Sequence, residues 1–144
     1  MVPDESLAQH VERVFRQHGI VSARLISVDP AGPDGISETA TFELDGLLLR
    51  FVRERTEVYL DIGTQLPDPE FHQFDDVEIA LGWTSVEEVL KKDSPEPLDR
   101  VIARVARSVA SLKAELYGPH AEWNRARILR ANSDRAKLRR QRLG

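Results

Sequence analysis

The sequence predicts an α+β fold: an N-terminal helix, a four-stranded antiparallel meander, short helices, one long helix and a C-terminal basic helical tail, with the helices packed on one face of the sheet. Two observations predict it. Apolar and polar residues alternate around an Asp-Gly turn over residues 37–63, as in strands. Over residues 98–116 apolar residues instead recur at spacings of three and four, as in a helix. A chain of 144 residues suffices for one such domain.

The N-terminal helix is predicted to begin at a cap formed by Asp4 or Ser6 and to end at Gly19. One stripe of this helix falls at helical spacing and consists of Leu7, Val11, Val14, Phe15 and His18. From Ile20 the apolar spacing changes to two and continues to Val28, after which a loop containing Pro and Gly follows. This segment is the first predicted strand.

Two tight turns set the register of the remaining strands. Asp45-Gly46 suits a type I′ turn, because both of its central positions require a positive φ, and Arg55-Thr56 is expected to form a second two-residue turn. The apolar pairs then share one face and are Leu44 with Leu47, Phe42 with Leu49, Ala40 with Phe51, Phe51 with Leu60, and Leu49 with Ile62. The other face is half-polar and holds Leu48 opposite Glu43, Arg50 between Thr41 and Asp61, and Val52 between Thr39 and Tyr59. Turn chemistry and hydrophobic alternation therefore select the same face for the core.

Two short helices are predicted after the sheet. Asp75 and Glu78 have the spacing of a capping box, and Gly82 ends the helix that they begin. Residues 84–88 offer a second cap, for a short helix that reaches about Lys92. The acids of the first short helix are interpreted as capping groups rather than as Mg²⁺ ligands.

The long helix is predicted to begin within residues 94–97, because proline is tolerated in a first turn, and to end at Gly118-Pro119. Its stripe is Leu98, Val101, Ile102, Val105, Ala106, Val109, Leu112 and Leu116. We expect one globular domain over 1–118 and a helical extension with a basic tail over 119–144. Asn132-Ser133-Asp134 is expected to interrupt that extension, and the part beyond it has no wide apolar stripe, as is typical of a solvated or partner-bound tail.

Charge is divided unequally along the chain. Residues 1–100 contain 9 Lys and Arg against 21 Asp and Glu, a net charge of −12, whereas residues 101–144 contain 11 against 3, a net charge of +8. A basic arm of this kind contacts something acidic, which is either a partner or the acidic body of the same chain.

Motifs for catalysis or metal binding are missing from the sequence. There are no cysteines, and the four histidines, His10, His18, His72 and His120, are scattered without a ligand spacing. We therefore expect no metal, no cofactor and no assignable catalytic residue, although an enzyme whose site forms only in three dimensions stays an open alternative. The lack of cysteines, of a leader pattern and of a long apolar run indicates a cytoplasmic protein without a membrane segment.

Binding to another protein is the leading functional hypothesis. The acidic body and the outer sheet face would form the contact, through Leu48, Arg50, Val52, Tyr59, Asp61, Asp68 and Glu70. A nucleic-acid or ribosome-associated factor is the alternative, and its contact residues in the tail would be Arg135, Lys137, Arg139, Arg140 and Arg142. A homo-oligomer is compatible with either hypothesis.

Residues 47–55 and 57–63, followed by Phe74-Asp75 and Leu81-Gly82, resemble the pattern of small cytoplasmic immunity proteins encoded beside bacterial polymorphic toxins. Many of those proteins are small α+β domains with a meander. The resemblance implies stoichiometric inhibition of a toxin through an acidic surface, which would suit a cationic toxin. It assigns no individual site residue.

Overall fold

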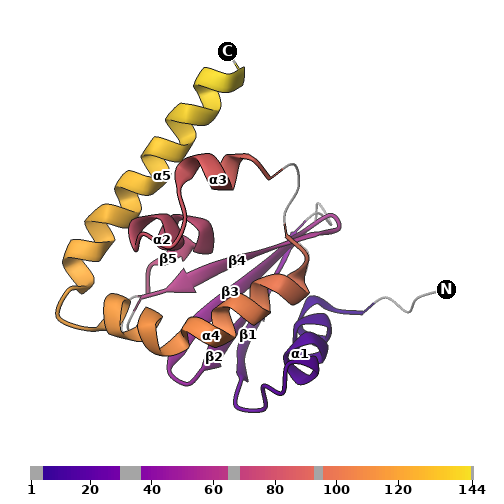
Figure 1. Cartoon of the computed structure of the whole chain (residues 1–144). Coiled ribbons are helices and arrows are strands. Elements are labelled where there is room, and N and C mark those ends of the chain that lie inside the picture. The colour runs from indigo at the N-terminus through magenta and orange to yellow at the C-terminus, as the bar shows by residue number, and fades with distance from the viewer. Residues whose placement is uncertain (1–4, 30–36, 65–68, 93–95, 144) are drawn as a thin grey trace.

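The fold is α+β, as predicted, in a computed structural model that describes residues 5–29, 37–64, 69–92 and 96–143. Figure 1 shows the arrangement of its elements. In chain order these are α1 (Leu7–Gln17), β1 (Arg24–Asp29), β2 (Ser37–Leu44), β3 (Leu47–Glu54), β4 (Glu57–Gly63), β5 (Phe71–Gln73), α2 (Phe74–Ala80), α3 (Val86–Leu90), α4 (Leu98–Tyr117) and α5 (Ala121–Leu143). The strands form one antiparallel sheet in the order β1-β2-β3-β4-β5.

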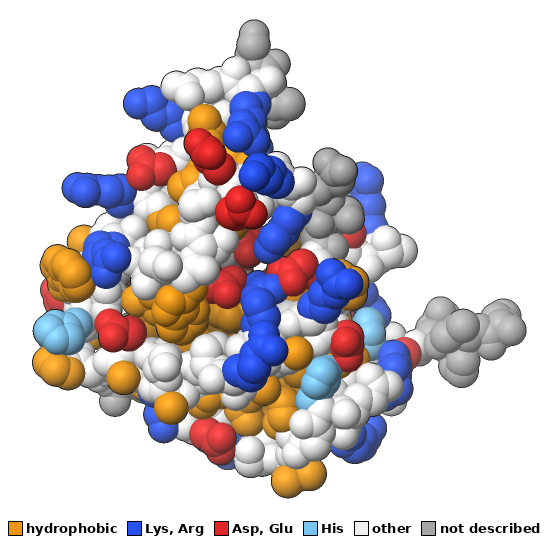
Figure 2. Space-filling model, in the orientation of Figure 1, with side chains coloured by type: hydrophobic (Ala, Val, Ile, Leu, Met, Phe, Trp, Pro, Cys, Tyr) orange, Lys and Arg blue, Asp and Glu red, His pale blue; other side chains and the backbone are white. Residues whose placement is uncertain are grey.

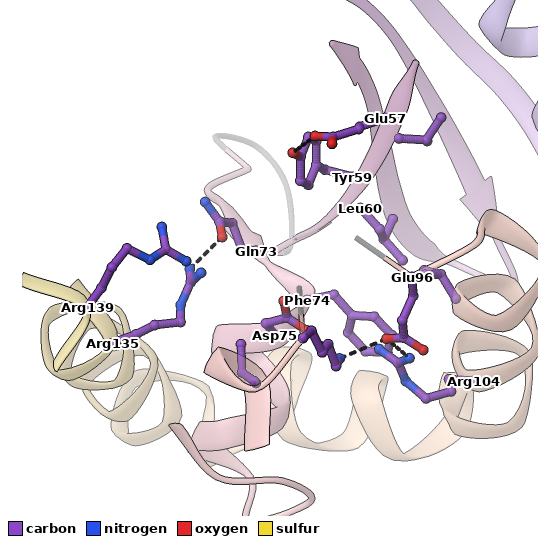
Figure 3. Close-up of a pocket in the computed structure, with 14 residues that line it drawn as sticks. Glu57, Tyr59, Leu60, Gln73, Phe74, Asp75, Glu96, Arg104, Arg135 and Arg139 are labelled. Atoms are coloured by element: carbon purple, nitrogen blue, oxygen red, sulfur yellow. Dashed lines mark hydrogen bonds and ion pairs between the residues drawn. The ribbon is translucent and has the colours of Figure 1, made fainter. Parts of the chain in front are cut away.

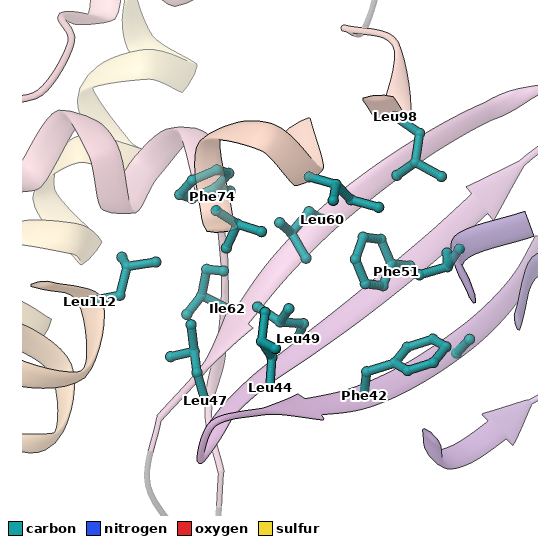
Figure 4. Packing of buried hydrophobic residues seen from close by; sticks show 14 of the residues in the cluster. Phe42, Leu44, Leu47, Leu49, Phe51, Leu60, Ile62, Phe74, Leu98 and Leu112 are labelled. Carbon is teal, nitrogen blue, oxygen red and sulfur yellow. The ribbon is translucent and has the colours of Figure 1, made fainter. Parts of the chain in front are cut away.

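The core lies between the sheet and the helices α1 and α4, which cover one face of it (Figure 1). Three phenylalanines from α1, β2 and β3 meet edge to face, with ring centroids 5.3 to 6.0 Å apart. Figure 4 shows the leucines and Ile62 of the strands continuing this layer toward Phe74 and Leu112. One face of the meander therefore carries the hydrophobic burial, as its alternation predicts.

The predicted register of the central strands is confirmed pair by pair. Leu44 lies opposite Leu47, and Arg50 lies between Thr41 and Asp61. Both residues of the Asp45-Gly46 turn have positive φ, which explains why this dipeptide suits the position.

Helix α1 begins where predicted, at a capping box in which Ser6 and Gln9 exchange side-chain and backbone hydrogen bonds. The first strand begins later than Ile20, because Arg24 pairs with Glu43 near the end of β2 and earlier residues would run past it. All six residues of β1 are exposed, and a bulge between Leu25 and Ser27 interrupts its register. Strand β1 lies at the edge of the sheet, and its alternation of apolar and polar residues does not correspond to buried and exposed positions.

Two elements differ from prediction around residue 73. Strand β5 is a fifth strand, and its three residues are too few to show an alternation. Helix α2 follows it directly at Phe74, and no side chain caps it. Asp75 and Glu78 therefore do not form the predicted capping box. Glu78 and the neighbouring Asp76 are instead buried in ion pairs with arginines of later helices.

Helix α5 is continuous through Asn132-Ser133-Asp134, so the predicted interruption is wrong. Its inward stripe is Asn124, Ile128, Ala131 and Arg135, which are buried at spacings of four and three. Two of these four residues are polar, which is why a hydrophobic pattern does not reveal the stripe. The helix packs against α2, α3 and α4, and its C-terminal end projects beyond them (Figure 1).

Several predictions concern residues outside the described ranges: a cap at Asp4, the loop after Asp29, a contact at Asp68, and a helix start at Ser94-Pro95. None of the helices in the described part of the chain is both long and apolar enough to cross a lipid bilayer.

A candidate binding cleft between strand β4 and helix α5

One half of strand β4 has an open edge. Strand β5 pairs with β4 only at Asp61, Ile62 and Gly63. Among the described residues no strand pairs with the preceding half, Glu57–Leu60, on the side away from β3. Strand β5 cannot continue along this edge, because Gln73 is its last residue and the next residue, Phe74, is buried as the start of α2.

Beside this open edge lies a cleft whose other wall is the C-terminal half of α5. It has two lobes, one on each face of the sheet, and Tyr59, Gln73, Arg135 and Arg139 line both of them. We call the space the β4–α5 cleft. Figure 3 shows Arg135 and Arg139 extending from α5 toward Gln73, with Tyr59 and Glu57 on the strand opposite.

The inner lobe, of about 340 Å³, lies on the core face of the sheet. Its apolar lining is Val58, Leu60, Phe74, Val89 and Val101. The outer lobe, of about 510 Å³, lies on the face of the sheet away from α1 and α4. The other residues that line it are Val52, Glu54, Asp61, Asn132 and Ala136.

A network of ion pairs fixes the rim of the inner lobe. Arg104 donates two hydrogen bonds to Glu78, of 2.8 and 3.1 Å, and also contacts Glu96, while its guanidinium lies over the Phe74 ring. Lys92 donates to Glu96 at 2.9 Å. Burial raises the pKa of Glu78 despite Arg104. Burial also acts to raise the pKa of Glu96, but the hydrogen bonds from Lys92 and Arg104 together lower it.

Arg135 holds α5 against α2 at the floor of the cleft. Its guanidinium donates to both carboxylate oxygens of Asp76, at 2.8 and 3.1 Å, and a further hydrogen bond reaches the Gln73 side chain. Asn132 donates to the same carboxylate at 2.8 Å. The Asp76 side chain is only 2% exposed and that of Arg135 10% exposed, so this pair is an interior contact. It places the next helical turn, with Arg139, opposite β4.

Tyr59 and Arg139 are exposed residues on the two opposite walls of the cleft. Tyr59 is 41% exposed, and its hydroxyl donates to Glu57. This hydrogen bond, with a smaller effect of burial, raises the pKa of Tyr59 to about 12. Arg139 is exposed and forms no ion pair with any described residue, whereas Lys92, Arg104 and Arg135 all have acidic partners.

The predicted outer-face contact residues are only partly brought together. Val52, Tyr59 and Asp61 line the outer lobe. Leu48 is buried, and Arg50 pairs with Asp61 at 2.8 Å while lying over the Phe71 ring. Glu70 lies elsewhere and accepts two hydrogen bonds of 2.9 Å from Arg125. Asp68 lies outside the described residues.

The predicted basic contact residues divide in a similar way. Arg135 and Arg139 line the cleft, but only Arg139 is exposed. Lys137, Arg140 and Arg142 are exposed and do not line it. The sheet face and the tail, predicted as alternative surfaces for different partners, therefore meet in one cleft.

Several of the acids of the body have basic partners within the chain. Glu70, Asp76, Glu78 and Glu96 pair with arginines of α4 and α5. The basic C-terminal part thus contacts the acidic body, which is one of the two outcomes that the charge division predicts.

Other cleft residues had no signal in the sequence. Gln73, Phe74, Arg104 and Asn132 come from four separate elements, and no spacing connects them. A weak signal existed in Arg135 and Arg139, since residues four apart share one helix face.

In the described part of the chain, no cluster of three His, Asp or Glu side chains is placed to hold a metal ion. Comparisons of the chain with family models, curated proteins and solved structures find no match.

Proposed function

We propose that this protein is a protein-binding domain that holds a segment of its partner in the β4–α5 cleft. The observation that carries the proposal is the open half-edge of β4 beside an exposed tyrosine and an arginine without an acidic partner among the described residues. Tyrosine and arginine are enriched at the centres of protein interfaces, because each combines a large contact area with hydrogen-bonding groups.

The construction of the cleft supports this proposal. The Arg135–Asp76 pair holds the α5 wall, and the Arg104–Glu78 pair holds the rim of the inner lobe. A cleft whose walls are already ordered loses little conformational entropy when a partner enters, so more of the contact energy appears as affinity.

The proposal is tested by selecting linear peptides from a random display library on the immobilised full chain and measuring their affinity by fluorescence anisotropy. Two exposed cleft variants, Tyr59→Ala and Arg139→Glu, are compared with the wild type. We expect each to weaken binding at least tenfold, since both remove groups at the centre of the contact.

Lys137→Glu is the matched control, because it makes the same charge reversal on the same helix outside the cleft. It should leave peptide affinity within about twofold of the wild type, as expected for a charge outside the contact. Failure to enrich any peptide, or equal losses in Lys137→Glu and Arg139→Glu, would overturn the proposal.

A narrower form of this proposal is that the domain is an immunity protein that binds a cationic toxin. It is supported by Glu54 and Glu57, which are exposed near the cleft and have no basic partner among the described residues. Such charges accelerate association with a cationic protein. The test is the on-rate for the product of any toxin gene adjacent to this one. The on-rate should fall at low salt in the double variant Glu54→Lys/Glu57→Lys. An unchanged on-rate would exclude the proposal of an immunity protein for a cationic toxin.

Nucleic-acid binding is the second candidate function. It is supported by Lys137, Arg139, Arg140 and Arg142, which are exposed, and Figure 2 shows basic side chains along the projecting end of α5. Phosphate binding depends on the total charge of the patch, so Lys137→Glu/Arg140→Glu should weaken it at least as much as Arg139→Glu. Salt-dependent affinity for labelled duplex DNA and RNA measures this effect, and no binding at low salt excludes this function.

A further inference from the structure

The hairpin register determines which backbone groups of β4 face the β4–α5 cleft. A two-residue turn at Arg55-Thr56 makes its flanking residues, Glu54 and Glu57, a hydrogen-bonded pair. The pairs then alternate along an antiparallel ladder, so the N–H and C=O groups of Tyr59 point toward β3. Those of Val58 and Leu60 point the opposite way, toward the cleft.

Strand β5 already uses the next position of the same edge. Ile62 has the same orientation as Val58 and Leu60, and it lies opposite His72 of β5. Among the described residues, Val58 and Leu60 have no strand opposite them. A partner segment beside them would lie in line with β5, beyond Gln73.

We propose that the partner enters the cleft as an extended segment that adds a strand to β4, opposite Val58 and Leu60. This inference rests on the proposed protein-binding function and specifies its mode. Strand addition satisfies four backbone groups of β4 that face the β4–α5 cleft, two N–H donors and two C=O acceptors.

The two lobes fit the two faces of such a strand. Successive side chains of an extended segment point to opposite faces of the sheet, so they enter the inner and outer lobes alternately. The inner lobe offers the apolar side chains of Val58, Leu60 and Phe74, which favour an apolar residue. The outer lobe offers Tyr59 and Arg139 together with the carboxylates of Glu54 and Asp61, and these groups favour a polar residue. The partner segment is therefore alternately apolar and polar.

The test uses the peptides selected on the full chain and the variant pair Val58→Pro and Val58→Thr. Proline removes the Val58 N–H, which points away from β3, and an edge strand tolerates it, whereas threonine keeps both the N–H and the side-chain shape. We expect Val58→Pro to bind about three- to tenfold more weakly than Val58→Thr, the effect of one lost hydrogen bond.

Two measurements on the wild-type chain keep the test independent of how the variants fold. Hydrogen exchange of the Val58 and Leu60 amides should slow at least tenfold when peptide binds, while the Tyr59 amide, already paired with β3, changes less. Peptides methylated at one backbone nitrogen each should bind more weakly only when the methyl group is at every second position, because only alternate N–H groups would face β4.

The failure of strand addition differs from the failure of the proposed function. Peptides that bind the cleft and lose affinity in Tyr59→Ala, but leave the Val58 and Leu60 amides unchanged, would overturn strand addition and leave protein binding supported. Peptides without an alternation of apolar and polar residues would also contradict it. If no peptide binds, the proposed function fails and strand addition fails with it.

Discussion

The two long helices, α4 and α5, are attached to the same body by different chemistry. The inward face of α4 is apolar, with Leu98, Ile102, Val105, Leu112 and Leu116 buried. The inward face of α5 has similar spacing, but Asn124 and Arg135 occupy two of its four buried positions. Each polar group has partners: Asn124 donates to Glu115, and Arg135 donates to Asp76.

This difference shows how a polar helix can be fixed without an amphipathic pattern. Hydrophobic burial is non-directional and tolerates small rotations of α4. A buried guanidinium on a carboxylate is directional, so it sets the rotation of α5 about its own axis. That rotation brings Arg139 to the β4–α5 cleft.

The largest effect is expected from breaking the polar attachment of α5. In Asp76→Ala the Arg135 guanidinium stays buried without its carboxylate, and we expect a loss of about 3–5 kcal/mol in unfolding free energy. Urea denaturation followed by circular dichroism measures it. A loss below about 1 kcal/mol would show that α5 does not depend on this pair.

The double variant Asp76→Leu/Arg135→Met serves as its control. Replacing a buried ion pair by apolar residues of similar size is often nearly neutral, so we expect stability within about 1 kcal/mol of the wild type. Peptide affinity for the cleft should nevertheless fall, because α5 loses the contact that fixes its rotation.

The apolar attachment of α4 is tested by Ile102→Ala, with Ile102→Val as the matched smaller truncation. Ile102 is fully buried in the core. Truncation to alanine should lower the unfolding free energy by about 3 kcal/mol, through lost burial and the cavity that remains, and truncation to valine should lower it by about 1 kcal/mol. Equal effects of the two variants would mean that the core closes around the truncated residue.

A smaller effect is expected at the start of α5. Asn124 is fully buried, and its amide donates to the backbone carbonyl of Glu115 at 3.0 Å and to the Glu115 carboxylate at 2.7 Å. Asn124→Ala removes both hydrogen bonds and should lower the unfolding free energy by about 1–3 kcal/mol, since the partly buried Glu115 carbonyl loses its partner. Thermal unfolding measures the loss, and an unchanged melting temperature would contradict this role.

The smallest effect is expected at the exposed pair between Glu70 and Arg125. The hydrogen bonds from Arg125 lower the pKa of Glu70 below its ordinary value of 4.5. The pair therefore contributes stability above pH 4.5, and this contribution is lost as pH falls through the lowered pKa. In Arg125→Ala the Glu70 titration midpoint, followed by carboxyl NMR, should rise toward 4.5, with a stability change of about 0–1 kcal/mol. An unchanged midpoint would show that the pair with Arg125 is not the cause of the lowered Glu70 pKa.

The sequence predicted those parts of the fold in which local chemistry and burial agree. The Asp45-Gly46 turn and the alternation around it gave the register of β2, β3 and β4 correctly. The apolar stripe of α4 was predicted for the same reason, except that Ala106 is exposed. Strand β5 and the start of α2 were missed, because three residues show no period and Glu78, predicted to form a capping box with Asp75, pairs with Arg104 of α4 instead.

The candidate cleft was predicted only in pieces. Tyr59 and Asp61 were placed on the correct sheet face, and Arg139 was named as a binding residue for a different partner. Their meeting depends on where α5 lies, and nothing local in residues 121–143 encodes that position.

By itself, the sequence determined the class of fold, the sheet register and the division of charge, because turn preference, periodicity and net charge are properties of neighbouring residues. Tertiary structure decided that Arg135 holds the helical tail on the acidic body, while the basic residues beyond it stay exposed. It also decided that half of β4 keeps an open edge. The reason is that the Arg135–Asp76 pair joins residues 59 positions apart, and such a contact exists only after the chain has folded.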